Sequence, residues 1–227
     1  MGKVVLYGTG RGASVAHRFL VADSDHEVVG FTVDAKFQMG ENFRGLPVVP
    51  FENVQDAFPA ASHSMLILLG YQEMNGLRAR KYHEAKAKGY TLESYVASDI
   101  FRVEPIKVGE NCFILDKQSI SLDVSIGNNV VMWSSNHIGD LTVISDHAWL
   151  TSHVTLAAGV TIGESAFVGI GATISNKVTV GRGSFVGANA MVSENVADGG
   201  VTIDGKSLLA NTPARTFMRV MMAKGKL

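Results

Sequence analysis

Three of the seven histidines of this 227-residue chain, together with Asp140, lie within residues 137–153. The histidines are His137, His147 and His153. Histidine is the usual general base near neutral pH, whereas a carboxylate is a weak base unless it is desolvated. Three histidines can also bind zinc. The stretch therefore predicts either general-base chemistry or metal binding. The secondary structure that positions these residues distinguishes between the two.

A second stretch is suited to binding phosphate. Residues 3–7 (Lys-Val-Val-Leu-Tyr) read as a buried strand, followed by G-x-G-x-x-A over residues 8–13 and a helix over residues 14–22. Glycines at Gly8 and Gly10 allow a tight turn and a close approach of backbone amides to a phosphate at the helix N-terminus. This pattern predicts a nucleotide site, and the alternative is a glycine turn needed only for packing.

The elements around the glycine stretch predict a small parallel α/β sheet. Further strands are expected at residues 28–33, 46–49 and 65–69, with helices at 51–58 and 74–88. Asp34 and Lys36 follow the second strand. A dinucleotide dehydrogenase is excluded, because the region before the repeat described next has room for only one mononucleotide-binding half.

Residues 108–197 carry a six-residue repeat that positions the histidines. Every sixth residue is aliphatic: Val108, Ile114, Ile120, Ile126, Met132, Ile138, Ile144, Leu150, Leu156, Ile162, Val168, Ile174, Val180, Val186 and Val192. The following residue is often glycine: Gly109, Gly127, Gly139, Gly163, Gly169, Gly181 and Gly187. The residue two places before each aliphatic is small or β-branched, except at Gln118 and Asn136.

A period of six does not fit a helix, but it fits a short strand followed by a turn. The aliphatic residue and the small residue two places before it then point inward, and the glycine step lets the backbone bend at each corner. Stacked repeats of this kind form a solenoid with one continuous core. The alternative is an ordinary β-sandwich with chance regularity, which fifteen repeats in phase disfavour.

The repeat resembles that of the hexapeptide-repeat acyltransferases. The resemblance implies a left-handed parallel β-helix of triangular section with about five coils, assembled as a homotrimer with active sites between subunits. With the α/β domain in front, the chain resembles the NeuD/PglD-type sugar acyltransferases. The expected domains are residues 1–97, which bind the nucleotide sugar, residues 98–197, which form the β-helix, and a C-terminal tail over residues 198–227 with a short helix.

The resemblance also implies roles for particular residues. Gly8, Gly10, Asp34 and Lys36 would contact the nucleotide, with Lys36 supplying charge to its phosphates. The segment Asn211-Thr212-Pro213-Ala214-Arg215 resembles the tail that follows the last coil in these enzymes. The residues expected to bind coenzyme A are Gly169, Gly187, Pro213 and Ala214. The segments 70–78 and 133–139 look characteristic of one branch of the family.

The chain departs from this family at the expected base. Relatives place a histidine at a prism corner four residues before an inward aliphatic residue, here Ile144, and the corner residue is Asp140. His137 precedes the inward Ile138, so it should point outward, and it is the best remaining base. Asp140 is the second candidate catalytic residue, which either orients the amine or the imidazole or is itself the base with a pKa raised by burial. Asn136 occupies an inward position, where its amide must find hydrogen-bond partners and fixes the backbone or orients His137. We interpret His147 as a solvated turn residue.

These departures bear on the reaction. Zinc binding is not expected, because the histidine spacings differ from those of hexapeptide-fold carbonic anhydrases, which resemble this chain in the prism alone. An amine needs little help from a base, whereas a hydroxyl must be deprotonated as it attacks. We therefore expect transfer of an acetyl or other short acyl group from acyl-CoA to a nucleotide-linked amino sugar. The alternatives are a sugar O-acetyltransferase and a non-catalytic nucleotide-sugar-binding trimer.

Composition limits the partners. The formal net charge is −1, so nucleic acid is not an expected ligand. The single cysteine, Cys112, lies at an inward position and is expected to pack. The longest apolar run, residues 65–69, is too short to span a membrane, and the N-terminus lacks a signal-peptide pattern. We expect a cytoplasmic enzyme of surface-glycan biosynthesis, such as that of lipopolysaccharide O-antigen.

Overall fold

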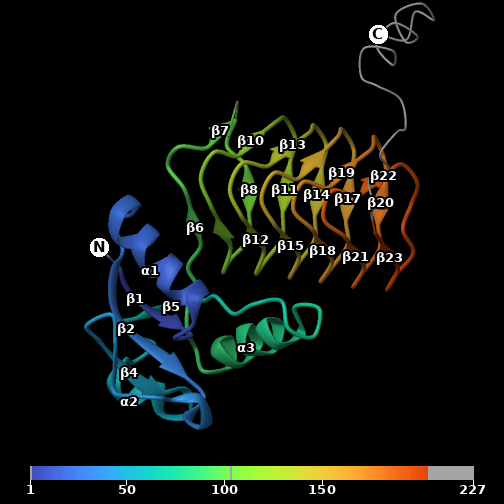
Figure 1. Ribbon diagram of the computed structural model, residues 1–227. Helices are drawn as coiled ribbons and strands as arrows, with labels where there is room; N and C mark the ends of the chain where they lie inside the picture. The colour runs from blue at the N-terminus through green and yellow to red at the C-terminus, as the bar shows by residue number, and fades with distance from the viewer. Residues whose placement is uncertain (1, 103, 204–227) are drawn as a thin grey trace, which may run out of the picture.

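The computed structural model describes residues 2–102 and 104–203, which form an α/β domain beside a three-sided β prism (Figure 1). The α/β sheet has the order β3-β4-β2-β1-β5 and is parallel except for β3. Its strands are β1 (Lys3–Tyr7), β2 (Glu27–Val33), β3 (Asn42–Phe43), β4 (Leu46–Pro50) and β5 (Ser64–Ile67). Its helices are α1 (Arg11–Asp23), α2 (Val54–Ala57) and α3 (Gly76–Ala87), with 3₁₀ turns η1 (Ala35–Phe37) and η2 (Phe51–Asn53).

The predicted parallel sheet is confirmed, with local differences. Helix α1 begins at Arg11, three residues before the expected start. Residues 51–58 form a 3₁₀ turn and one short helix instead of a single helix. Helix α3 begins at Gly76 because Met74 and Asn75 have φ of 50° and 66°, values that a right-handed helix does not contain. The antiparallel hairpin β3–β4 was not predicted; Arg44 and Gly45 turn it with φ of 53° and 81°, as a two-residue hairpin requires.

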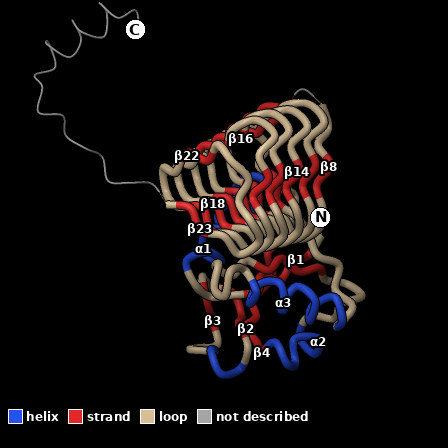
Figure 2. Tube along the Cα trace, turned by 90° about the vertical axis from the view of Figure 1, so that its right-hand side faces the viewer, coloured by secondary structure: helices blue, strands red, loops and turns tan. Residues whose placement is uncertain are grey.

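The repeat forms a prism with three parallel sheets (Figures 1 and 2). Sheet 1 contains β6 (Tyr95–Val96), β9 (Phe113–Ile114), β12 (Val131–Met132), β15 (Trp149–Leu150), β18 (Phe167–Val168), β21 (Phe185–Val186) and β23 (Val201–Thr202). Sheet 2 contains β7 (Phe101–Arg102), β10 (Ser119–Ile120), β13 (His137–Ile138), β16 (Thr155–Leu156), β19 (Thr173–Ile174) and β22 (Met191–Val192). Sheet 3 contains β8 (Lys107–Val108), β11 (Ser125–Ile126), β14 (Val143–Ile144), β17 (Thr161–Ile162) and β20 (Thr179–Val180).

The left-handed β-helix and its three hexapeptides per coil are confirmed. Paired strands lie eighteen residues apart, as Val131 and Trp149 do. The aliphatic and small inward residues form one continuous buried cluster, and Cys112 is buried within it. Within the described residues, the prism strands run from Tyr95 to Thr202. They therefore extend beyond the expected limits of the β-helix domain, residues 98 and 197, at both ends.

The glycines of the repeat do not make the bends, which corrects the sequence interpretation. The bend is two residues further on, where φ is positive, and most of these residues are not glycine, as at Asn111, Lys117 and Leu141. The glycines instead allow successive coils to approach closely. A Cβ on Gly169 would lie 2.6 Å from the backbone nitrogen of Ala188 in the next coil.

The α/β domain lies along sheet 1, as Figure 2 shows. Outward aromatic residues of that sheet are covered by it: Phe19 of α1 packs against Tyr95 and Phe113, with ring centroids 5.9 and 6.5 Å apart. Asp23, at the end of the same helix, accepts hydrogen bonds from the hydroxyl of Tyr95 at 2.6 Å and the backbone N–H of Ser98 at 2.9 Å. One apolar cluster, separate from the inward core of the prism, therefore spans the junction between the two units.

A buried polar chain also joins the two units. The side chain of Asn111 accepts from the N–H of Ile67 at 2.8 Å and donates to the Oδ1 of Asn129 at 2.7 Å. The Nδ2 of Asn129 then donates to the Nδ1 of His147 at 2.8 Å, so this imidazole nitrogen must be unprotonated. His147 occupies a turn, but it is 6% exposed, so its interpretation as a solvated residue is wrong.

We predict that Gly169→Ala lowers the free energy of unfolding by about 1–3 kcal/mol, because the new Cβ would overlap backbone that cannot move alone. Gly40→Ala is the matched control, since a Cβ there would meet nothing within 4 Å. Urea unfolding followed by circular dichroism measures both. Equal stability of the two variants would contradict the close-approach role of Gly169.

We also predict that stability falls as the pH is lowered. Burial, and then the nearby Arg78 charge and that of His83, lower the pKa of His147, while Asp146 and Glu164 oppose the shift; the rings of Tyr82 and His83 also face it. The folded state thus binds a proton less readily than the unfolded state, whose pKa is about 6.5, and stability present above that pH is lost below it.

Urea midpoints measured between about pH 7.5 and pH 5 should show this loss, and His147→Asn should reduce it. Asparagine tolerates the positive φ and can accept from Asn129 without titrating. His17, whose pKa burial also lowers, is the same in both proteins. An identical pH dependence in the variant would exclude His147 as its source.

Candidate active site

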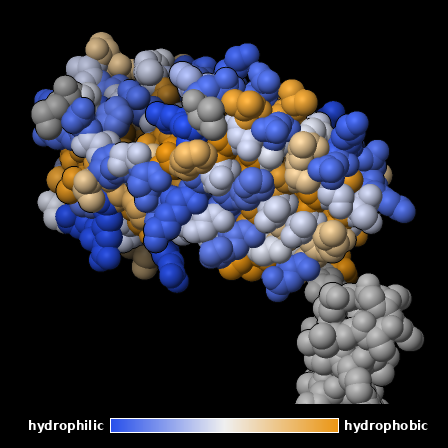
Figure 3. All heavy atoms as spheres, turned by 90° about the horizontal axis from the view of Figure 1, so that it is seen from above, coloured by the Kyte–Doolittle hydropathy of each residue, from blue (hydrophilic) through white to orange (hydrophobic). Residues whose placement is uncertain are grey.

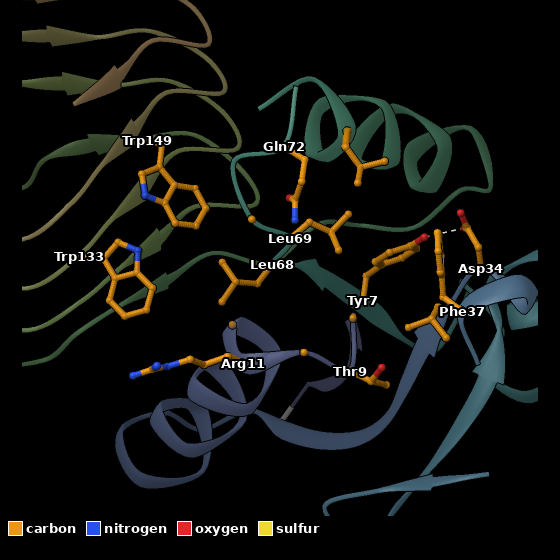
Figure 4. A pocket seen from close by; sticks show the side chains of 16 residues that line it. Tyr7, Thr9, Arg11, Asp34, Phe37, Leu68, Leu69, Gln72, Trp133 and Trp149 are labelled. Carbon is orange, nitrogen blue, oxygen red and sulfur yellow. Dashed lines mark hydrogen bonds between the residues drawn. The ribbon is translucent and has the colours of Figure 1, made fainter. Parts of the chain in front are cut away.

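A pocket of about 540 Å³ lies where the α/β domain meets sheet 1 (Figure 4). The glycine loop, residues 8–12, lines it together with the segments that follow β2 and β5. Trp133 and Trp149 line it from the prism. Both domains therefore contribute to the pocket, and neither domain forms it alone.

The glycine loop leaves the N-terminus of α1 free to bind an anion. Gly8 has φ of 119°, which favours glycine, and its N–H donates to the carbonyl of Thr32 at 2.8 Å. A Cβ on Gly10 would meet nothing within 4 Å, so there is open space beside it. Helix α1 has no side-chain cap and no acidic residue in its first turn. Its first amides thus remain available for a phosphate.

Asp34 lies at the far end of the pocket and is already engaged. It accepts hydrogen bonds from the hydroxyl of Tyr7 at 2.6 Å and the ammonium of Lys81 at 2.7 Å. Burial raises the pKa of Asp34, but the hydrogen bonds from Lys81 and Tyr7 and the nearby positive charges outweigh it, so the net pKa is lowered. Asp34 is therefore a fixed anion at neutral pH.

Lys36 does not line this pocket. Its ammonium lies 5.0 Å from the ring centroid of Phe37, and its side chain lines a neighbouring hollow that also includes Asp34, Lys81 and Lys88. Its assignment to the nucleotide phosphates stays a prediction. The glycine loop, rather than Lys36, lies within the pocket itself.

His137 is exposed on β13 of sheet 2, pointing outward as predicted. Asn136, just before it, is buried, donates to the carbonyl of Trp133 at 2.6 Å and accepts from the N–H of Val154 at 2.8 Å. Its amide therefore fixes the backbone of two adjacent coils. Gly169 and Gly187 lie in the prism away from this pocket, and Pro213 and Ala214 are outside the described residues.

Asp140 has a structural role that the sequence did not reveal. Its Oδ1 accepts from the backbone N–H of Leu122, one coil earlier, at 3.1 Å. Residues at the same place in other repeats do the same: Asp146 accepts from Asn128 at 2.8 Å and Asn176 from Ala158 at 3.2 Å. Asp140 thus belongs to a series of side chains that satisfy backbone amides between coils.

Within residues 2–102 and 104–203 the structure has no group of three histidine, cysteine or acidic side chains arranged to hold a metal ion. The same residues include no helix long and apolar enough to cross a membrane.

The fold is that of a left-handed β-helix protein with an N-terminal α/β domain, and comparisons with known proteins agree. Residues 159–194 match the family model "bacterial transferase hexapeptide (six repeats)". No curated protein sequence matches the chain.

Several solved structures share this architecture. A histidine variant of perosamine N-acetyltransferase from Caulobacter crescentus, in complex with CoA and GDP-perosamine, matches with a TM-score of 0.78 and 23% identity over 90% of this chain and 94% of that one. The acetyltransferase domain of PglB from Neisseria gonorrhoeae FA1090, with acetyl coenzyme A, has a TM-score of 0.75 and 17% identity over 88% and 94%. WeeI from Acinetobacter baumannii AYE has a TM-score of 0.76 and 16% identity over 90% and 97%.

We predict that Asp140→Ala lowers the free energy of unfolding by up to about 1 kcal/mol, because the N–H of Leu122 loses its acceptor. Asp140→Asn keeps an acceptor oxygen and should preserve stability. Asn176→Ala, at the same corner, should resemble Asp140→Ala. Thermal unfolding compares the three variants with the wild type. An Asp140→Ala variant as stable as the wild type would contradict a stabilising role for the Leu122–Asp140 hydrogen bond.

Proposed function

We propose that the chain is an acyl-CoA-dependent N-acyltransferase that acylates the amino group of a nucleotide-linked sugar. The observation that carries the proposal is the pocket that joins the free N-terminus of α1 to the outward residues of the prism. The shared architecture with acetyltransferases crystallised with CoA, acetyl coenzyme A and GDP-perosamine supports it. In this proposal Gly8 and Gly10 bind the diphosphate and Asp34 contacts the nucleoside.

The proposed reaction needs modest help from the protein. The sugar amine attacks the thioester carbonyl, a C–N bond forms, and the C–S bond breaks to release coenzyme A as the thiol. The amine loses a proton to a base as the intermediate collapses, and the base passes that proton to the departing sulfur, so the step balances. His137 is the proposed base because it is outward and exposed on β13, the strand that begins four residues after Trp133, although it does not itself line the pocket. Gly169 and Gly187, with Pro213 and Ala214, remain the proposed CoA contacts.

A homotrimer would complete the site. Leu122, Leu141 and Val143 lie on either side of Asp140 and are 43%, 62% and 42% exposed, so this corner presents apolar side chains that a second subunit would cover. On the side of the molecule that is uppermost in Figure 1, apolar groups lie among hydrophilic ones (Figure 3). We place the reaction in the cytoplasm, in the synthesis of surface glycans such as lipopolysaccharide O-antigen.

A second function is favoured by one observation. The carboxylate of Asp140 is engaged with the N–H of Leu122, so the corner where related acyltransferases are expected to place a histidine is used to hold two coils together. With aspartate in place of histidine at this corner, the second candidate function is a trimer that binds a nucleotide sugar without acylating it. An O-acetyltransferase is less favoured, since a hydroxyl acceptor depends more strongly on a base.

The test is release of thiol from acetyl-CoA in the presence of a panel of nucleotide-linked amino sugars. We expect turnover with at least one sugar, and a kcat lowered about 10²-fold or more in His137→Ala with little change in KM. Thr155→Ala is the matched control, because Thr155 pairs with His137 on the adjacent strand and points the same way. Binding of a nucleotide sugar without turnover would favour the non-catalytic function.

A further inference from the structure

The pocket has two ends that differ in chemistry. Figure 4 shows Trp133 and Trp149 at one end, and Tyr7, Asp34 and Phe37 at the other. Leu68 and Leu69 lie between the two ends, above the glycine loop, and the side chain of Arg11 extends from that loop toward the tryptophans. A ligand whose phosphates bind at the glycine loop would therefore reach in both directions. Each end must receive a different part of the molecule.

The end at Asp34 suits the nucleoside. In α/β nucleotide-binding domains an acidic residue after the second strand contacts the ribose hydroxyls, and Asp34 follows β2. Tyr7 and Lys81 both donate to the Oδ1 of Asp34. Among the described residues none donates to the Oδ2, which can therefore accept from a ribose hydroxyl. The group beyond the phosphates must then lie at the tryptophan end.

The tryptophan end is rigid. Trp149 is 6% exposed and is held by the guanidinium of Arg78, 5.5 Å from its ring centroid, and by Tyr71, whose ring lies edge-on at 5.6 Å. Arg78 is itself fully buried and donates to the carbonyls of Asn129 and His147. Trp133 is half-buried and lies 6.4 Å from Trp149 with the two rings tilted by 42°. The rings form a fixed, angled apolar wall.

Such a wall is suited to a sugar ring. One face of a pyranose presents C–H groups, which pack on the electron-rich face of an indole, while its edge carries hydroxyl and amino groups. Polar partners for that edge are present, because Gln72 and Arg11 also line this end of the pocket. The wall therefore provides both a stacking surface and hydrogen-bonding groups around it.

We infer that Trp133 and Trp149 contact the sugar ring of the nucleotide sugar and determine which sugars are accepted. The inference rests on the proposed function and adds the residues that select the acceptor. Trp133 supplies the more exposed ring, and Trp149 packs beside it at 6.4 Å and lines the pocket as well. This arrangement brings the sugar to the prism side of the pocket.

The experiment is calorimetry on the full chain with GDP, UDP and dTDP, each alone and each linked to an amino-hexose. Wild-type protein should bind one nucleotide sugar more tightly than its nucleotide. Trp133→Leu should weaken binding of that nucleotide sugar about tenfold, with a change of less than about twofold for the nucleotide alone. Trp133→Phe, which keeps an aromatic ring, should lose much less.

The matched control is Phe185→Leu, an aromatic change on the same face of sheet 1 outside the pocket, which should alter neither affinity. Equal weakening of nucleotide and nucleotide sugar in Trp133→Leu would overturn the inference while leaving the proposed function intact. Unchanged binding of both would also overturn it. Wild-type protein that binds none of the six compounds would overturn the proposed function, and this inference with it.

Discussion

The structure depends on the close stacking of successive coils in the prism. Each coil donates backbone N–H groups to the next, as Val131 does to Ala148 at 3.1 Å and His137 to Val154 at 2.9 Å. This stacking leaves no room for a side chain at Gly169, and the bend two places after that position is made with a positive φ. Sheet 1 is held rigid in this way, so the α/β domain can pack against a fixed surface. The pocket lies where that surface meets the glycine loop.

The repeat made most of the fold predictable. Fifteen aliphatic positions in phase indicate a solenoid of short strands, and the resemblance to the hexapeptide-repeat acyltransferases implied its left-handed, three-sided form. The strand–glycine–helix start indicated a parallel α/β unit. The junction between them could not be predicted in the same way. Arg78, Asn111 and His147 are polar residues that the sequence places in a helix or in turns, where exposure is the usual outcome. They are buried because each meets a partner from a distant segment.

The candidate site was predictable only in part. Gly8, Gly10 and Asp34 were found because their spacing is a local property, and all three line the pocket. Trp133 and Trp149 were not singled out as binding residues, although their outward positions on sheet 1 follow from the repeat. Asp140 was recognised as unusual, but its bond to Leu122 depends on a contact eighteen residues away. The shared position of Asp146 and Asn176 in the repeat was the available signal.

The equivalence of the coils has a consequence for how such a protein can change. A side chain and its counterpart eighteen residues later point in the same direction and are displaced by about 4.8 Å along the prism axis. A functional group can therefore be moved along the axis in fixed increments by exchanging equivalent residues, without rotating it or altering the backbone. The α/β domain packs at one position along the prism axis, so the coil that carries a functional group determines how far that group lies from the domain. A group lost from one coil can be replaced by an equivalent residue of the adjacent coil, one strand spacing away.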